Sequence, residues 1–311
     1  MQKLSEFYES IFGCKTYKIS LDAGCTCPNR DGTKGKGGCI FCSENGSGDF
    51  AAARNLSIKE QLEQGRSLVE SKLRGRSGER RGKYIAYFQN FTSTYGDANV
   101  LLEKYCEALS CEGVAGLAVA TRPDCINEQI LTGLADISKN HFVQIELGLQ
   151  TSNEKTGLLI NRCYTNQDYI DVVARIHKAA PQIHIVTHLI FGLPGETEED
   201  MLNSVQFVVG LNQTSQGLIR QSFFGLKITS LYVLKNTRLA AMYEAGNFQT
   251  LNKEQYFNLL EKALPLLSDD CVVHRLTGDP PKSLLIAPAW PADKKRVLNH
   301  LLTLLNSHNR I

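Results

Sequence analysis

Four of the ten cysteines in this 311-residue chain lie close together in one segment. The segment, called the cysteine loop below, covers residues 24–42 and reads GCTCPNRDGTKGKGGCIFC. Residues 1–18 carry scattered charges and lack the apolar core of a signal peptide, so we expect a cytoplasmic protein. In that reducing compartment, clustered cysteines indicate metal binding or catalysis rather than disulfides. The six dispersed cysteines are interpreted as small buried hydrophobic residues.

The spacing of the clustered cysteines predicts a metal centre. The Cys39-x-x-Cys42 pair can direct two thiolates at one centre, and eleven residues, many of them glycine, separate Cys27 from Cys39. Three thiolates on a four-iron cluster leave one iron open for a second cofactor. A fourth ligand, Cys25, would instead give a closed cluster or a tetrahedral zinc site.

Apolar runs with strand character alternate with helical patterns along the first part of the chain. Strands are expected at residues 16–21, 84–89, 116–121, 142–149, 184–191 and 223–228. Helices are expected at residues 57–74, 98–109, 127–135, 167–178 and 198–211. Because parallel strands need crossover helices, this alternation predicts an α/β fold, a partial parallel (β/α)6 barrel. Catalytic groups of such barrels lie at the carboxyl ends of the strands.

The alternation weakens after Ile228. Helices are expected near residues 238–245, 253–267 and 292–306, with one strand near residues 272–275. We therefore expect two units. The barrel with its cysteine loop covers residues 1–230, and a small C-terminal α/β extension packed on it covers residues 231–311.

The cysteine loop resembles the cluster motif of radical S-adenosylmethionine (SAM) proteins. Its long first spacing is similar to that of the Elongator catalytic subunit, and CPNRDG followed by GGC and an aromatic-Cys ending resembles a related bacterial family without the acetyltransferase half. Further matching motifs follow in order: YFQNFTSTYG (residues 87–96), TRPDC (121–125), ELGLQT (146–151), NR (161–162), HLIFGLPGET (188–197) and HR (274–275). The resemblance thus covers nearly the whole chain.

The resemblance implies a radical SAM enzyme with two cofactors, a [4Fe-4S] cluster and SAM. Its iron ligands would be Cys27, Cys39 and Cys42, with Cys25 a bystander. SAM contacts are implied for Phe41, Gln89, Asn90, Thr121, Arg122, Glu146, Gln150, Arg162, Ile190 and Gly192. One electron from the reduced cluster would cleave SAM to methionine and a 5'-deoxyadenosyl radical, which abstracts hydrogen from the substrate. No residue is assigned as a general acid or base.

Several of these positions also have simpler interpretations. Phe41 could be a core aromatic residue, and the GLPGET segment could be a plain turn in which Glu196 or Thr197 caps the next helix. Glu146 interrupts an apolar strand, where an unpaired carboxylate would be costly, so an ion pair with Arg122 or Arg162 is the alternative to a cofactor contact.

The resemblance also implies a substrate, the wobble uridine of tRNA, at the step that generates a 5-aminomethyl group. An electron donor such as flavodoxin or ferredoxin would be a partner. The chain departs from the family at Cys163 and Tyr164, where relatives often carry Gly-His, and at KITSLY (residues 227–232), where relatives are often His-rich. These departures leave a peptide or a small molecule open as the substrate. A zinc-stabilised RNA-binding module without redox chemistry is the alternative from another class.

The overall charge gives no strong preference for nucleic acid. The formal net charge is +2, from 34 Lys and Arg against 32 Asp and Glu. One local basic cluster, between residues 72 and 83, could bind phosphates or could be a solvated loop. It contains Lys72, Arg74, Arg76, Arg80, Arg81 and Lys83. No apolar stretch is long enough for a membrane span, so no membrane partner is expected.

Overall fold

The computed structural model describes residues 1–44, 46, 54–73, 82–213 and 224–308. Within these residues, eight parallel strands form one sheet in the order β1-β9-β7-β6-β5-β4-β3-β2. The strands are β1 (Gln2–Lys3), β2 (Lys15–Leu21), β3 (Gly82–Phe88), β4 (Val114–Thr121), β5 (Phe142–Gln150), β6 (His184–Phe191), β7 (Phe224–Ser230) and β9 (Cys271–Arg275). The prediction of a partial parallel α/β barrel is confirmed, and β1 and β9 extend its six strands.

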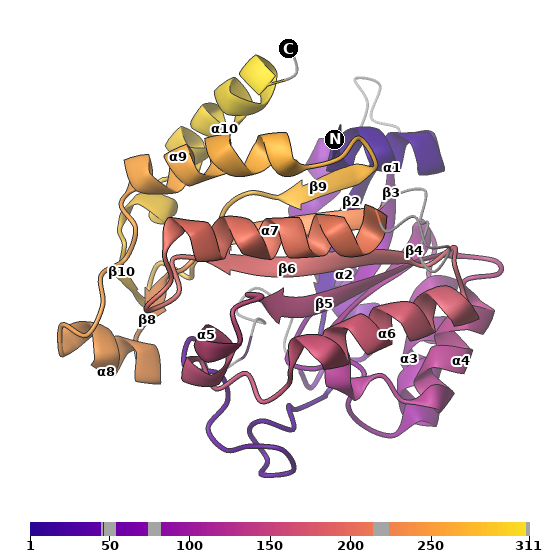
Figure 1. The fold of residues 1–311 in the computed structure, drawn as a ribbon. Helices are drawn as coiled ribbons and strands as arrows, with labels where there is room; N and C mark the ends of the chain where they lie inside the picture. Colours follow the sequence, from indigo (N-terminus) through magenta and orange to yellow (C-terminus); the bar gives the residue numbers. More distant parts are fainter. Residues whose placement is uncertain (45, 47–53, 74–81, 214–223, 309–311) are drawn as a thin grey trace.

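Most of the helices cover one face of this sheet, which we call the outer face, whereas α1 crosses the amino end of the sheet and α8 lies apart from it beside β8 (Figure 1). The helices are α1 (Leu4–Phe12), α2 (Ile58–Leu73), α3 (Ala98–Ser110), α4 (Glu128–Ile137), α5 (Glu154–Leu159), α6 (Asn166–Ala179), α7 (Glu198–Gln213), α8 (Arg238–Glu244), α9 (Lys253–Ala263) and α10 (Lys294–His308). The sequence analysis did not anticipate α1 or α5. Two short strands, β8 (Val233–Leu234) and β10 (Leu285–Ala287), form a separate antiparallel pair.

The sheet is strongly curled, and α1 shows why it must be. The strands β1 and β2 are consecutive in the chain but lie at opposite edges of the sheet. In a flat sheet seven strand spacings would separate them by about 34 Å. The nine residues of α1 span about 14 Å, so the two edges must curve toward each other to be joined. The result is an open barrel with α1 across its amino end.

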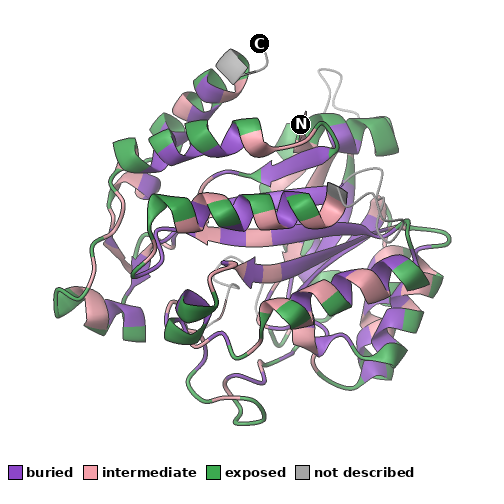
Figure 2. Cartoon of the chain, in the orientation of Figure 1, coloured by how far each residue is buried: buried purple, intermediate pink, exposed green. Residues whose placement is uncertain are grey.

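The two faces of the curled sheet bury different kinds of side chain. Outer-face residues such as Leu117, Val119 and Ile145 pack with the covering helices in the main hydrophobic core. On the concave inner face, Phe7 and Tyr8 of α1 fill the amino end in a smaller apolar cluster. The strands are mostly buried, whereas the helices expose the sides that face away from the sheet (Figure 2). The carboxyl half of the inner face is therefore the part of the barrel left open for chemistry.

The C-terminal segment contributes to the same sheet. Its strand β9 pairs with β7 on one side and with β1 on the other, in the registers Phe224↔Cys271 and Gln2↔Val272. The division at residue 230 stays a prediction, but the segment that follows it both extends the sheet and packs on it. No helix among the described residues combines the length and the apolar character that a membrane span requires.

Candidate functional site

The cysteine loop leaves the carboxyl end of β2 and is folded by its own backbone hydrogen bonds. The amides of Arg30 and Asp31 donate to the carbonyl of Cys27, at 2.8 and 3.2 Å, and the amide of Cys42 donates to the carbonyl of Cys39 at 3.1 Å. The guanidinium of Arg30 donates to the backbone carbonyls of Cys42, Ser43 and Glu44. These bonds return both ends of the loop toward one another.

Two asparagines fasten the cysteine loop to the barrel. The fully buried Asn29 amide donates to the Asn161 carbonyl at 2.5 Å, and its Nδ2 lies 3.7 Å from the Cys39 sulfur. In return, Asn161 Nδ2 donates to the carbonyl of Gly38 at 2.8 Å. Asn161 adopts a φ of +56°, and Gly38 a φ of +74°, a conformation that favours glycine. A side chain on Gly38 would also meet the Arg30 side chain, so both the backbone conformation and the limited space favour glycine at this position.

The three predicted iron ligands are close enough to influence one another's charge. The thiols of Cys39 and Cys42 are hydrogen-bonded, which lowers the pKa of Cys42 and, together with burial, raises that of Cys39. The positive charge of Arg30 lowers the pKa of Cys42 further, whereas the charge of Cys27 acts in the opposite direction. Among the described residues, no group of three or more His, Cys, Asp or Glu side chains is arranged to hold a single metal ion. The ligands of a four-iron cluster bind separate irons and lie farther apart, and the sulfur donor set fits that group.

The other cysteines have different surroundings. Cys25 lies in the main hydrophobic core with 5% exposure, and burial raises its pKa to about 11. Of the six dispersed cysteines, Cys125 and Cys271 are buried as expected. The interpretation is wrong for Cys106 and Cys163, which are exposed. The Cys163 thiol lies 3.3 Å from Asn29 Oδ1, so this departure from the family contacts the base of the cysteine loop.

Three of the predicted SAM-binding positions share an apolar environment beside the cysteine loop. Phe41 and Ile190 both pack, half-buried, against a small apolar cluster that includes Ile40 and Leu193. Nearby, Gly192 begins the turn after β6 with a φ of +92°. As the simpler interpretation of GLPGET predicted, the Thr197 hydroxyl accepts a hydrogen bond from the Asp200 amide at the start of α7.

The polar positions at the strand ends differ in exposure. Gln89 and Gln150 are half-buried at the ends of β3 and β5, and Gln89 accepts a hydrogen bond from Ser20 at 3.0 Å. Asn90 and Thr121 are buried instead. Asn90 Nδ2 donates to Asp22 at 2.8 Å, and the Thr121 hydroxyl lies 2.6 Å from that of Thr94.

The two predicted arginines are occupied by protein acceptors. All five N–H donors of the fully buried Arg162 are used, by the carbonyls of Leu149, Thr151 and Tyr164 and by the side chains of Glu154 and Asn166. Arg122 forms a two-point ion pair with Asp124, both bonds at 2.9 Å. The Tyr164 ring lies 4.8 Å from each guanidinium carbon. Both arginines thus position the β5–α6 connection, and their SAM contacts stay predictions.

Glu146 has partners that the sequence analysis did not foresee. Its carboxylate bonds to Lys18 at 2.5 Å, to His188 at 2.8 Å, and to Lys227 and Tyr87. We call these five residues the interior charge network. The suggested ion pair of Glu146 with Arg122 or Arg162 is wrong, because those arginines pair with Asp124 and Glu154.

The interior charge network has strongly shifted pKa values. Burial alone would raise the pKa of Glu146, but the charges of Lys18 and Lys227 hold it well below its usual range. Burial lowers the pKa of Lys227 to about 7 and that of His188 to about 4. Glu146 is therefore ionised at neutral pH and His188 is neutral. Polar residues at alternate positions of successive strands were the sequence signal for this network, since alternate residues share one face of a strand.

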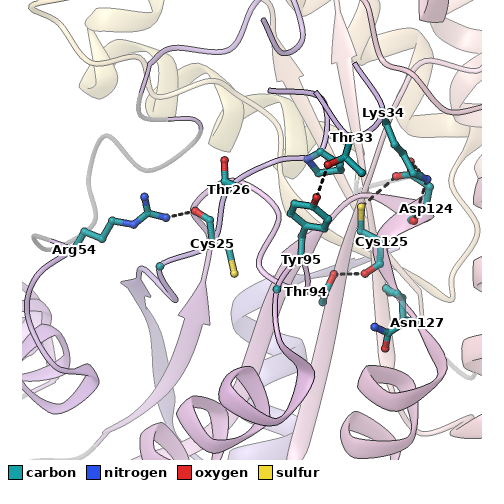
Figure 3. A pocket seen from close by; sticks show the side chains of 14 residues that line it. Cys25, Thr26, Thr33, Lys34, Arg54, Thr94, Tyr95, Asp124, Cys125 and Asn127 are labelled. Carbon is teal, nitrogen blue, oxygen red and sulfur yellow. Dashed lines mark hydrogen bonds and ion pairs between the residues drawn. The ribbon is translucent and has the colours of Figure 1, made fainter. Parts of the chain in front are cut away.

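A pocket of about 750 Å³ lies beside the cysteine loop, between it and the loops that follow β3 and β4 (Figure 3). Its polar lining is already paired. Tyr95 hydrogen-bonds to Thr33 at 2.9 Å, and Lys34 forms an ion pair with Asp124 at 2.7 Å. Most of the predicted basic cluster, residues 74–81, lies outside the described residues; Lys72 and Lys83 are exposed.

Comparisons with known proteins agree with this geometry. The uncharacterized protein YtqA of Bacillus subtilis (strain 168) is 38% identical over 287 residues, which cover 92% of this chain and 84% of that protein. The tRNA-2-methylthio-N(6)-dimethylallyladenosine synthase of Acetivibrio thermocellus is 27% identical over 196 residues, 62% of this chain and 38% of the synthase.

A solved structure has the same fold. The archaeal Methanocaldococcus infernus Elp3 with an N-terminal deletion superposes with a TM-score of 0.62 at 15% identity, covering 87% of this chain and 58% of that one. The family description "Radical SAM superfamily" matches residues 27–208, from the first predicted ligand to α7, and "Radical_SAM C-terminal domain" matches residues 224–306. This chain belongs to the radical SAM superfamily and is an enzyme whose cofactors are a [4Fe-4S] cluster and SAM.

Proposed function

We propose that this enzyme binds its [4Fe-4S] cluster through Cys27, Cys39 and Cys42 and modifies the wobble uridine of tRNA, at the step that generates a 5-aminomethyl group. The observation that carries the cluster assignment is the fastening of the cysteine loop by Asn29 and Asn161. These bonds support the assignment because they hold the loop that carries all three cysteines against the barrel, while Cys25 lies in the hydrophobic core.

The cofactors supply the radical chemistry, reductive cleavage of SAM to a 5'-deoxyadenosyl radical, and the chain supplies position and enclosure. Arg30 and the two asparagines orient the cysteine loop. Phe41 and Ile190 form an apolar surface suited to the adenine of SAM, and Gln89 and Gln150 offer amides to its polar groups. Helices on the outer face and α1 at the amino end exclude water from the barrel on those sides.

One comparison supports tRNA as the substrate. The synthase that aligns with this chain is named for a tRNA nucleoside. The exposed Lys72 and Lys83 flank the rest of the basic cluster and could contact phosphates. The proposal includes a cytoplasmic location and reduction of the cluster by flavodoxin or ferredoxin, acidic electron carriers of that compartment.

The test uses anaerobic reconstitution with iron and sulfide, followed by dithionite, SAM and tRNA from cells that lack this gene. We expect 5'-deoxyadenosine together with a mass change at the wobble nucleoside. Cys27→Ala should abolish both, whereas Cys25→Ala, two residues away, should retain the brown cluster. 5'-Deoxyadenosine without any change in tRNA would overturn the tRNA assignment and favour a peptide or small-molecule substrate. A colourless zinc protein would overturn the cluster assignment.

A further inference from the structure

The pocket beside the cysteine loop lies on the outer side of that loop, away from the positions assigned to SAM. Its lining includes Gly96, which precedes α3, and Asn127, whose side chain caps α4 (Figure 3). Both helices pack on the outer face of the sheet. None of the residues with an implied SAM contact is part of the lining. The pocket is therefore open to a partner while SAM and the substrate occupy the barrel.

A thin wall separates this pocket from the predicted cluster ligands. Cys25, Thr26 and Pro28 line the pocket, whereas Cys27, between them, does not. The Cys27 side chain therefore points away from the pocket, to the side on which its charge acts on Cys42. Electron transfer slows steeply with distance, so a redox partner seated on this wall would be close to the cluster without entering the barrel.

The exposed charge of the pocket lining is positive. Three charged residues line it, and of these Lys34 and Arg54 have side chains that are 42% and 49% exposed. The third, Asp124, is only 4% exposed and also forms an ion pair with Arg122. One buried carboxylate is thus shared by two cations, and a partner on the surface meets mainly the lysine and the arginine.

A further cation lies at the edge of the pocket. The Lys104 ammonium, on α3, lies beside the pocket residue Gly24 and donates to the carbonyl of Ala23 at 2.6 Å. Among the described residues, no carboxylate forms an ion pair with it. Two exposed acids nearby, Asp31 and Asp97, accept hydrogen bonds from backbone amides of their own segments. The cations therefore keep most of their charge available to a partner.

Arg54 is held in place before any partner arrives. Its guanidinium donates to the carbonyl of Cys25, lies 3.7 Å from the buried Asp22 carboxylate, and lies over the Phe91 ring at 5.7 Å from the centroid. The same ring contacts Arg30 at 5.3 Å. A cation that is already ordered costs less side-chain entropy when a partner binds.

We propose that this pocket, with Lys34, Arg54 and Lys104 around it, is the docking site of a small acidic electron-carrier protein that reduces the cluster. The inference rests on the proposed function, which includes such a carrier. On docking, one electron leaves the reduced carrier and enters the oxidised cluster, and no bond is formed or broken. The surface thus gives the electron a path that is separate from the path of the substrate.

The position and size of the charged surface favour a protein carrier over RNA. Encounters between electron-transfer proteins use small interfaces, in which complementary charge raises the rate of association. A tRNA that presents a nucleoside to the barrel must instead approach the open carboxyl ends of the strands, and its many phosphates need a longer basic surface than three side chains provide.

The experiment compares a docked reductant with one that needs no docking. Reconstituted enzyme is titrated anaerobically with flavodoxin and with ferredoxin by calorimetry, at low and at high salt, and cluster reduction is followed by absorbance. The triple variant Lys34→Gln, Arg54→Gln, Lys104→Gln should bind the carrier about tenfold or more weakly, with less dependence on salt. Its cluster content and its rate of reduction by dithionite, a small ion, should not change.

A matched control and a milder variant keep the test decisive. Lys295→Gln removes an exposed cation on α10 and should leave carrier binding unchanged. Circular dichroism and iron analysis check that each variant is folded and loaded. If the triple variant does not fold, Lys104→Gln alone and the salt dependence of the unmodified enzyme still decide, because a docking site built on charge must weaken in both.

Several outcomes would overturn the docking site. They are no binding of either carrier, equal binding to the triple variant and the unmodified enzyme, or equal losses of reduction by carrier and by dithionite. Displacement of the carrier by tRNA, with weaker tRNA binding in the triple variant, would identify an RNA surface instead. These outcomes are separate from failure of the proposed function. An enzyme reduced through these residues that leaves tRNA unchanged would keep the docking site and lose its tRNA assignment.

Discussion

The cysteine loop and the interior charge network lie at two levels of the same barrel and are held together by different forces. In the cysteine loop, amides, carbonyls and one guanidinium form the framework around the thiols. In the interior, the framework is itself charged, with Glu146 between two lysines. The first arrangement fixes a shape that changes little with pH. The second responds to protons and to charged ligands, which suits a site that must recognise a substrate.

Removing the central carboxylate should give the largest effect on stability. Glu146→Gln leaves Lys18 and Lys227 buried without their counterion, which should cost about 3–5 kcal/mol of unfolding free energy. Urea denaturation of the two proteins at pH 7 measures the difference. Glu128→Gln is the matched control, since both side chains of its pair with Arg175 are exposed. A loss below 1 kcal/mol for Glu146→Gln would contradict the charged framework.

The corresponding change in the cysteine loop should cost less stability but affect the cofactor. Asn29→Ala removes the buried amide that joins the loop to Asn161, and we expect a loss of about 1–3 kcal/mol. Iron and sulfide analysis after reconstitution should show a clearly reduced cluster content. Asn140→Ala, at an exposed position after α4, serves as the control. Full cluster content in Asn29→Ala would show that the glycine-rich backbone holds its shape without this contact.

The charged framework should also make stability depend on pH. The pKa of Lys227 is lowered by burial to about 7 in the folded protein from the usual lysine value of 10.5, so between these values the unfolded chain binds more protons. The free energy of unfolding should therefore rise as pH increases from about 7 to 10.5, and this group should cause no further change below about pH 7, where it is protonated in both states. Urea midpoints at several pH values should rise more steeply in the unmodified enzyme than in Lys227→Met. Parallel curves would contradict the shifted pKa.

A surface pair at the edge of the cysteine loop should contribute least. The Lys34 side chain is 42% exposed in its pair with Asp124, and exposed ion pairs contribute about 1 kcal/mol or less. Lys34→Met should therefore change the unfolding free energy by no more than that, with less effect at high salt. A larger loss would show that the loop depends on charge as the interior does, and the contrast between the two regions would disappear.

The sequence carried most of the fold because strand-like apolar runs alternate with helical patterns, the order that parallel strands and their crossover helices require. It did not reveal α1, whose role depends on a contact between the two edges of the curled sheet. The cysteine cluster was recognisable from local spacing, whereas Cys27, Cys39 and Cys42 were assigned as ligands by the family resemblance and stay predictions. Asn161 belonged to one of the matching motifs. The interior charge network was harder to see, since Lys18, Glu146 and Lys227 come from strands far apart in the sequence. Only the folded, curled sheet brings their side chains together.

The pairing of β1 with β9 has a consequence for the order in which the molecule forms. Residues 2–3 hydrogen-bond to residues 272–273, so this part of the sheet joins segments from opposite ends of the sequence. Contacts of such large sequence separation form late, because the chain must close a long loop to make them. During synthesis on the ribosome, the cysteine loop emerges long before β9 does. The barrel edge beside α1 is therefore completed last, and until then the lysine-lined interior is open to water and to chaperones.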